Sequence, residues 1–191
     1  MTVGVLLLAA GCSERFGSDK RLALMADGRS LLFAAVSSIQ RSGLPLRVCL
    51  RPGDDRLGDS LLCAGVEVLE CERAARGMGA TLADAVNQSL DWNGLLVALA
   101  DMPVIHPATF RQVAEAVTAD VIVTPTFAGK SGHPVGFGRD FFADLAGLDG
   151  DRGARDLVMA SHRLRLPVAD PGILRDVDSP AALRSLAELL T

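Results

Sequence analysis

Short apolar runs alternate with stretches of helical periodicity along the first two thirds of the chain. Residues 3–9 are apolar throughout except for Gly4, a pattern typical of a central parallel strand that is covered on both faces. Runs of this kind predict strands over residues 3–9, 46–50, 66–69, 95–100 and 121–123. Helical spacing of apolar residues predicts helices over residues 30–41, 55–63, 80–90 and 107–117. The alternation predicts an α/β fold, with a three-layer, doubly wound and mostly parallel sheet.

Several helix ends carry recognisable signals. Ser30 suits an N-cap, and Gly43 is placed to close the same helix. Pro107 suits the first turn of its helix, where a missing N–H costs nothing. Near the end of the chain, Ser179 and Pro180 together predict the cap and first residue of a final helix.

The pattern loosens after residue 127. A glycine-rich turn at 129–132 precedes an extended stretch at 134–137, two short helices and a strand at 164–168. Because neither an internal repeat nor a linker divides the chain, we expect one domain over residues 1–191.

Composition and charge narrow the range of functions. The 191 residues are 49% hydrophobic and 22% charged, as in ordinary globular proteins. With 4% aromatic residues and a net charge of −4, the chain offers neither stacking platforms nor a basic stripe for nucleic acid. The longest apolar run, residues 5–10, is too short to span a bilayer and lacks a basic flank. We therefore expect a cytoplasmic protein with no nucleic-acid or membrane partner.

Two segments lie where the carboxyl ends of parallel strands meet, which is where ligands of open α/β sheets bind. The first is the loop after residues 3–9, in which Gly11 and Gly17 let backbone N–H groups turn toward an anion and Arg15 and Lys20 add positive charge. Five residues separate its glycines and no G-K-[ST] follows, so it is not a Walker loop. The second segment is the turn at Asp101. Taken alone, the first loop can equally be an ordinary turn with surface bases.

Six segments, in order, extend this picture across the chain. Residues 8–20 follow the pattern L-A-A-G-x-S-x-R-x-G-x-x-K, and the others are A-R-G-M-G-A-T-L at 75–82, A-D-M-P at 100–103, G-H-P-V at 132–135, G-D-R-G-A-R at 150–155 and D-V-D-S-P at 176–180. This set resembles the molybdenum cofactor nucleotidyltransferase family, which has a glycosyltransferase-A-like fold. The last three segments look closest to its cytidylyltransferase branch.

The departures from the family pattern are small. Phe16 stands where Met is usual, Thr81 where Ser is usual, and Ala100 where Gly is frequent. The turn at Gly77 and Gly79 also begins a dinucleotide-binding pattern, but Leu82 replaces its third glycine and the turn follows the third strand. A nicotinamide enzyme is therefore a weak alternative.

The resemblance implies a metal-dependent reaction. A phosphate oxygen attacks the α-phosphorus and pyrophosphate leaves in line, so the enzyme supplies positioning and charge stabilisation. Mg²⁺ prefers carboxylates together with phosphate oxygens, and Asp101 and Asp178 are the expected ligands. Each has an alternative role as a helix cap, Asp101 before Pro107 and Asp178 beside Ser179. Asp19 is interpreted as a solvated charge.

The expected site residues follow from the same motifs. Lys20 and Arg15 are expected to hold the β- and γ-phosphates, which makes them catalytic together with Asp101. The expected nucleotide contacts are Leu8, Ala9, Ala10, Gly11, Ser13, Arg15, Gly17, Lys20, Gly79, Thr81 and Asp101. Thr81 has an N-cap role as its alternative. The expected acceptor contacts are His133, Asp151 and Arg155, so residues 1–125 form a nucleotide-binding half and residues 126–191 an acceptor-binding half.

The substrates implied are CTP and molybdopterin, giving molybdopterin cytosine dinucleotide. Ala10 is the residue that favours CTP, since relatives of the CTP branch carry L-A-A-G and those of the GTP branch tend to carry L-A-G-G. The alternatives are a GTP-dependent enzyme and a nucleotidyltransferase with another phosphorylated acceptor. A non-enzymatic nucleotide-binding protein that delivers the cofactor also stays open. A recipient molybdoenzyme or its chaperone is a further expected partner.

Overall fold

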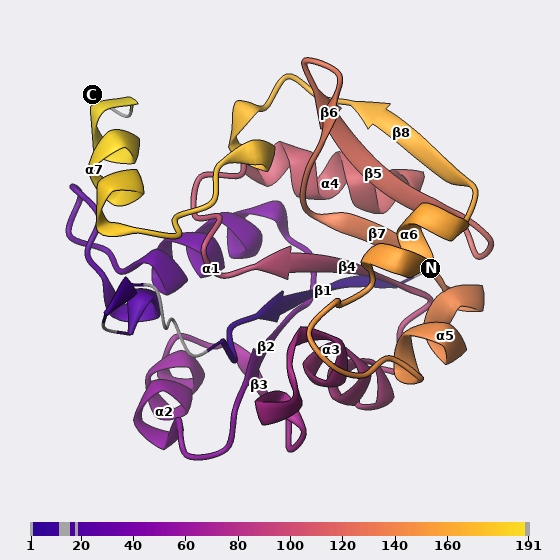
Figure 1. The fold of residues 1–191 in the computed structure, drawn as a ribbon, viewed down its shortest axis with the longest axis horizontal. Coiled ribbons are helices and arrows are strands. Elements are labelled where there is room, and N and C mark those ends of the chain that lie inside the picture. Colours follow the sequence, from indigo (N-terminus) through magenta and orange to yellow (C-terminus); the bar gives the residue numbers. More distant parts are fainter. Residues whose placement is uncertain (1, 12–15, 18, 190–191) are drawn as a thin grey trace.

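The computed structural model describes residues 2–11, 16–17 and 19–189 and contains one eight-stranded sheet (Figure 1). Its strands are β1 (Val3–Leu8), β2 (Leu46–Leu50), β3 (Glu67–Glu70), β4 (Gly94–Leu99), β5 (Ile122–Phe127), β6 (Lys130–Ser131), β7 (Val135–Gly138) and β8 (Arg163–Pro167). The helices are α1 (Leu31–Ser42), α2 (Asp55–Cys63), α3 (Met78–Asn87), α4 (Pro107–Ala116), α5 (Phe142–Ala146), α6 (Arg155–Ala160) and α7 (Pro180–Leu189). Four 3-10 helices are also described: η2 (Lys20–Leu22), η3 (Ala74–Arg76), η4 (Arg139–Phe141) and η5 (Pro171–Leu174).

The sheet is mostly parallel, as the sequence predicts. Its order is β3-β2-β1-β4-β7-β5-β6, and β8 pairs with β5. Strand β1 lies at the centre, where Leu7 is aligned with Val48 of β2 and with Ala98 of β4 in parallel register. Strand β7 is inserted antiparallel between β4 and β5. The parallel strands β1 and β4 consequently end side by side, at the edge where a ligand site is expected.

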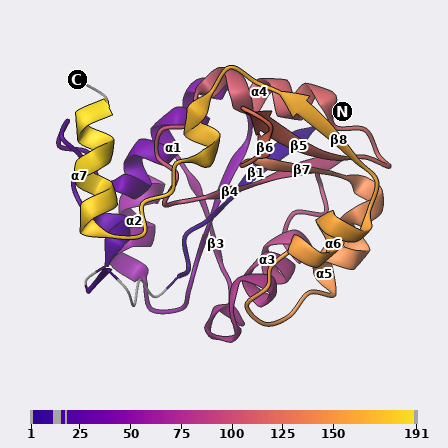
Figure 2. The same cartoon turned by 45° about the horizontal axis from the view of Figure 1, so that its top comes forward.

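Helices lie on both faces of the sheet (Figure 2), and alternate residues of the central strand belong to the cores on its two sides. Val5 and Leu7 belong to the core on the side of α1 and α4. Leu6 and Leu8 belong to the core on the side of α3 and α5. Because successive side chains of a strand point to opposite faces, a strand covered on both faces must be apolar throughout, which accounts for the unbroken run in the sequence.

The capping signals are confirmed. The Ser30 hydroxyl accepts the Phe33 N–H at 3.4 Å, and Gly43 ends α1 in the left-handed conformation. Helix α7 begins at Pro180, and the Ser179 hydroxyl accepts the Ala182 N–H at 3.2 Å. These contacts satisfy backbone groups that have no partner within the helix.

Some predicted boundaries were wrong. The helix expected over residues 80–90 begins at Met78 and ends at Asn87. The strand expected over residues 121–123 continues to Phe127, because its far end pairs with β6 and β8. Pro125 makes that stretch a poor strand by local propensity, and pairing with distant segments overrides it.

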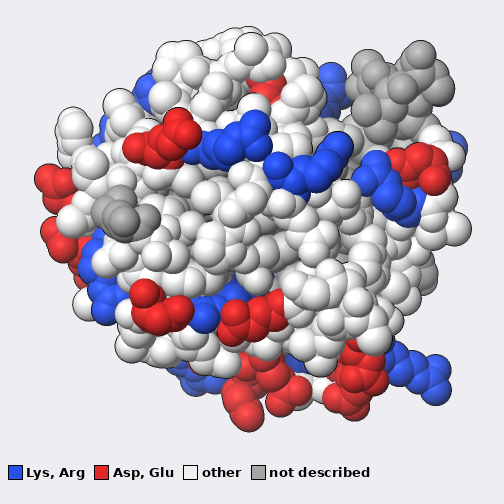
Figure 3. Space-filling model, turned by 180° about the vertical axis from the view of Figure 1, so that it is seen from behind, with Lys and Arg blue, Asp and Glu red and all other residues white. Residues whose placement is uncertain are grey.

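Charged side chains of both signs lie beside one another on the face seen from behind (Figure 3). Some charged side chains of opposite sign form ion pairs. Examples in the molecule are Arg47 with Asp91 at 2.8 Å and Arg73 with Asp84 at 2.6 Å. In the part of the chain that the structure describes, none of the helices is both long enough and apolar enough to cross a membrane.

The packing of Trp92 on β1 gives a test of the fold. A methyl group at Gly4 would overlap the buried indole ring of Trp92. We expect Gly4→Ala to lower the free energy of unfolding by about 1–3 kcal/mol in urea denaturation. The control is Gly147→Ala, whose new Cβ would lie 3.5 Å from its nearest neighbour, the Asp144 carbonyl oxygen. A change of more than about 0.5 kcal/mol is not expected there. Equal stabilities of the two variants would contradict this packing.

Candidate active site

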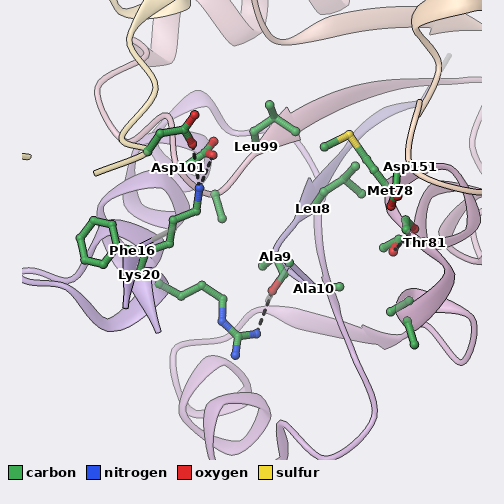
Figure 4. A pocket seen from close by; sticks show the side chains of 17 residues that line it. Leu8, Ala9, Ala10, Phe16, Lys20, Met78, Thr81, Leu99, Asp101 and Asp151 are labelled. Atoms are coloured by element: carbon green, nitrogen blue, oxygen red, sulfur yellow. Dashed lines mark hydrogen bonds and ion pairs between the residues drawn. The ribbon is translucent and has the colours of Figure 1, made fainter. Parts of the chain in front are cut away.

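A cavity of about 620 Å³ opens where β1 and β4 end (Figure 4). Its floor is the end of β1 and the following residues, Leu8 to Gly11, together with Leu99 at the end of β4 and Ala100 after it. The remaining lining residues form two walls and are Phe16, Lys20, Arg21, Asp101 and Asp178 on one side and Ala74, Ala75, Gly77, Met78, Thr81 and Asp151 on the other. This volume lies in the range of small-molecule sites.

Three charged residues from distant parts of the sequence meet at the first wall. Lys20 Nζ lies 2.7 Å from Asp101 Oδ2 and 3.3 Å from Asp178 Oδ1. Asp101 is in the turn after β4, Asp178 precedes α7, and Lys20 begins η2. The Val177 N–H donates to the Asp101 carbonyl oxygen at 2.9 Å, which fixes the two carboxylate segments side by side. The structure thus brings together three residues that the sequence motifs singled out.

The helix-cap alternatives for these two carboxylates are wrong. The N-cap residue of α4 is His106, and the carboxylate that binds at this end of the helix is Asp170, whose Oδ2 accepts the His106 N–H at 2.9 Å and the Thr109 hydroxyl at 2.6 Å. Helix α7 is capped by Ser179. Neither helix therefore requires Asp101 or Asp178 at its N-terminus.

The two carboxylates fit a divalent cation. Asp101 Oδ1 is buried and has no hydrogen-bond partner among the described residues, which leaves one strong acceptor oxygen for a ligand. Among those same residues, no cluster of three or more metal-binding side chains is present. A cation held by Asp101 and Asp178 would need further ligands from substrate and water, which is the usual arrangement for Mg²⁺ in phosphate-transfer sites.

The electrostatics of this wall keep Lys20 charged. Burial lowers the pKa of Lys20, but hydrogen bonds and charge attraction from Asp101 and Asp178 outweigh burial and raise the pKa above its usual value. Lys20 is consequently an ammonium ion at neutral pH, held about 3 Å from the two carboxylates. The ammonium group of Lys20 can bind a phosphate once another cation is bound to the carboxylates of Asp101 and Asp178.

Arg21 is a cavity residue that sequence reasoning missed. Its side chain is 4% exposed and binds the Asp19 carboxylate, the Asp54 carboxylate and, at 2.8 Å, the Ala9 carbonyl oxygen. Asp19 is therefore not the solvated charge that was expected, and its pKa is lowered mainly by hydrogen bonding to Arg21. A signal was present in the charged triplet at residues 19–21, but nothing in the sequence connects it with residue 54.

The opposite wall is formed by two loops in close contact. The Gly79 N–H donates to the Gly150 carbonyl oxygen at 2.7 Å, so it is already occupied. A side chain at Gly77 would place its Cβ 2.7 Å from that same carbonyl oxygen, and the φ angle of Gly77 is +114°, which L-residues rarely adopt. Asp151 is brought into the cavity by this contact.

Thr81 lies inside α3, so its N-cap alternative is wrong. The helix is preceded by Gly77, and the Thr81 hydroxyl donates to the Gly77 carbonyl oxygen at 3.0 Å. A hydroxyl group retains two lone pairs when it donates. Thr81 can consequently accept a hydrogen bond from a ligand in the cavity.

Several expected contacts lie elsewhere. His133 is partly buried with its Nδ1 3.4 Å from the Val97 carbonyl oxygen, and burial lowers its pKa. Arg155 is exposed at the start of α6. Neither is among the residues that line the cavity, and Gly17 is exposed outside it. Ser13 and Arg15 lie outside the described residues. The ligand contacts expected of these residues remain predictions.

The molecule has a mostly parallel sheet, with a lysine and a pair of carboxylates near the carboxyl ends of β1 and β4. This is the architecture of a nucleotidyltransferase. The model of the MobA-like NTP transferase domain matches residues 5–165. The chain belongs to that family and is a nucleotidyltransferase, in agreement with the family resemblance of its motifs.

Individual relatives resemble this chain over nearly its whole length. The purine catabolism protein PucB of Bacillus subtilis (strain 168) is 28% identical, over 93% of this chain and 92% of that protein. The crystal structure of Rv0371c from Mycobacterium tuberculosis H37Rv has a TM-score of 0.83 and 29% identity, with 98% of each chain covered. A structure of Rv0371c in complex with manganese gives a TM-score of 0.82 and 26% identity, again over 98% of each chain.

The position of Lys20 between two carboxylates leads to a prediction about metal affinity. Removal of its charge in Lys20→Ala should make Asp101 and Asp178 a better site for Mn²⁺ in the absence of nucleotide. We expect the Kd for Mn²⁺, measured by electron paramagnetic resonance, to fall about tenfold, as relief of 1.4 kcal/mol of repulsion would give.

Lys130→Ala is the matched control, because Lys130 is the other lysine of the chain and lies exposed on β6. Its affinity for Mn²⁺ should equal that of the wild type. Unchanged or weaker binding in Lys20→Ala would mean that the two carboxylates do not form the metal site.

Proposed function

We propose that this protein transfers CMP from CTP to molybdopterin in a Mg²⁺-dependent reaction, releasing pyrophosphate and forming molybdopterin cytosine dinucleotide. The observation that carries the proposal is the contact of Lys20 with both Asp101 and Asp178 at the wall of a nucleotide-sized cavity. The family assignment supports the reaction type. The choice of CTP and of molybdopterin rests on the sequence motifs.

Asp101 and Asp178 would hold the metal. Asp101 Oδ1 is buried without a partner among the described residues, and Asp178 is 51% exposed at the cavity mouth, where a metal–triphosphate complex can enter. When bound, Mg²⁺ supplies positive charge that makes the α-phosphorus more electrophilic and neutralises the triphosphate. The manganese complex of Rv0371c supports a divalent metal in this fold.

Lys20 has a separate role in the reaction. A phosphate oxygen of the acceptor forms a bond to the α-phosphorus, and the bond between the α-phosphorus and the bridging oxygen breaks, so that its electron pair leaves with pyrophosphate. The ammonium group of Lys20 can release the carboxylates and contact this developing negative charge. While it contacts the two carboxylates the pKa of Lys20 is raised, so the group is an ammonium ion before the nucleotide binds.

Ala10 is the proposed determinant of the base. It is 6% exposed and lines the cavity directly after β1. Its methyl group narrows the space beside the loop backbone, which a pyrimidine tolerates better than a purine. One such contact contributes about 1–3 kcal/mol of discrimination, so further selectivity must come from hydrogen bonds of the loop amides.

The acceptor is proposed to enter beside the second wall. Asp151 is the expected acceptor contact that lines the cavity. His133 and Arg155 are not among the lining residues, so the contacts proposed for them require a part of the acceptor that extends beyond the cavity. The division into a nucleotide-binding half and an acceptor-binding half is proposed on the same basis.

The nucleotide preference tests the proposal. We expect pyrophosphate release in the presence of molybdopterin and Mg²⁺ to be fastest with CTP when the four triphosphates are compared at equal concentration. A preference for CTP over GTP of about tenfold corresponds to 1.4 kcal/mol. Equal or faster pyrophosphate release with GTP would refute the assignment of CTP as the donor. Pyrophosphate release that does not depend on molybdopterin would refute the assignment of molybdopterin as the acceptor.

Asp101→Asn is the control for metal dependence in the same assay. It preserves shape but removes the charge that would hold Mg²⁺, so kcat should fall by roughly 10²-fold or more with the fold retained. Near-normal turnover of this variant at limiting Mg²⁺ would contradict the role of Asp101.

A further inference from the structure

Two arginines bind the backbone carbonyl groups of the loop that follows β1. Arg21 Nη1 donates to the Ala9 carbonyl oxygen at 2.8 Å, and Arg51 Nη1 donates to the Gly11 carbonyl oxygen at 3.5 Å. Asp54 connects the two arginines, since its Oδ1 lies 2.9 Å from Arg21 Nη2 and 3.4 Å from Arg51 Nε. Figure 4 marks the bond that reaches Ala9. The loop backbone is thus anchored through its oxygens.

Arg21 has no donor left for a ligand, although it lines the cavity. A guanidinium group carries five N–H donors. Nε donates to Asp19 Oδ1 at 2.8 Å, and Nη2 donates to Asp19 Oδ2 at 2.6 Å and to Asp54 Oδ1 at 2.9 Å. Nη1 donates to Asp54 Oδ2 and to the Ala9 carbonyl oxygen. Because all five donors are used and the side chain is 4% exposed, direct binding of a phosphate by Arg21 would require breaking this network.

The bond to Ala9 determines the direction of a neighbouring donor. In a trans peptide unit the C=O and N–H bonds point in opposite directions, and the peptide bond between Ala9 and Ala10 is trans. Holding the Ala9 oxygen toward Arg21 therefore turns the Ala10 N–H away from Arg21. The hydrogen bond to the Ala9 oxygen also polarises the peptide unit and strengthens that N–H as a donor.

We propose that Arg21 is a positioning residue for the donor nucleoside triphosphate. It acts through the peptide unit between Ala9 and Ala10, whose N–H it orients for hydrogen bonding to the nucleotide. The inference rests on the proposed function, in which this loop binds the donor. Lysine cannot replace Arg21, because a single ammonium point cannot reproduce two bidentate carboxylate contacts and a carbonyl contact.

The test is Arg21→Lys, with Arg47→Lys as its matched control. Arg47 also has two carboxylate partners, Asp91 at 2.8 Å and Glu67 at 3.0 Å, and it stacks 4.4 Å from the ring of Trp92. It is not one of the residues that line the cavity. Both substitutions remove an ion-paired guanidinium group. If CTP affinity responded only to a loss of stability, it should therefore change alike in the two variants.

The readouts are the Kd for CTP with Mg²⁺, measured by calorimetry without acceptor, the KM for molybdopterin and the stability to urea. We expect Arg21→Lys to weaken CTP binding at least about tenfold, the factor that corresponds to a 1.4 kcal/mol loss of binding energy, and to leave the acceptor KM within about twofold, because no acceptor contact is removed. Arg47→Lys should bind CTP as the wild type does. Equal CTP affinity in the two variants would overturn the inference.

A second variant covers the case in which Arg21→Lys does not fold. Asp54→Asn keeps the size of the side chain but weakens its hold on both arginines. We expect CTP binding to weaken about threefold to tenfold, as partial loss of a charge-assisted contact would give. Unchanged CTP affinity in Asp54→Asn, with the fold intact, would overturn the inference independently.

Failure of the inference can be distinguished from failure of the proposed function. The wild type is first titrated with each of the four triphosphates and Mg²⁺. A wild type that binds none of them would overturn both the inference and the proposed function. If the wild type prefers GTP, the variants are titrated with GTP, and a selective loss in Arg21→Lys would still support the role of Arg21.

Discussion

Two carboxylates that approach each other at the mouth of a cavity repel, and in this protein Lys20 is the charge that stabilises their approach. Its ammonium group lies 2.7 Å from Asp101 and 3.3 Å from Asp178. The side chains of Lys20 and Asp101 are only 21% and 18% exposed. Because water screens partly buried charges less, the electrostatic attraction between these groups is strong. The same ammonium group that stabilises the ligand-free site is proposed to assist departure of pyrophosphate. The contact of Lys20 with Asp101 and Asp178 therefore matters both for the stability of the site and for the proposed reaction.

The rest of the fold brings these groups together. Parallel strands β1 and β4 end at the same edge of the sheet, so the loop that leads to Lys20 and the turn at Asp101 are neighbours. The hydrogen bond from the Val177 N–H to the Asp101 carbonyl oxygen adds Asp178 from the end of the chain. Arg21, which follows Lys20 directly, anchors the same segment to the end of β1 through Ala9.

Much of this arrangement could be predicted from the sequence. The run of residues 3–9, apolar except for Gly4, predicts a strand buried on both faces, and the order of the motifs indicates that Lys20 and Asp101 share a site. The network around Arg21 could not be predicted, because it includes Asp54, which is 33 residues away. The contact of Asp170 with the N-terminus of α4 was also missed, since this carboxylate reaches His106 across 64 residues. Such contacts depend on tertiary packing, which local spacing does not report.

The central claim is that a divalent cation displaces Lys20 from Asp101 and Asp178 when the donor nucleotide binds. A crystal structure with Mn²⁺ and a non-hydrolysable CTP analogue would test it directly, because anomalous scattering locates manganese unambiguously. The account predicts an anomalous peak between the carboxylates of Asp101 and Asp178, with Lys20 Nζ moved onto a phosphate oxygen. Manganese bound elsewhere, with Lys20 still in contact with both carboxylates, would contradict it.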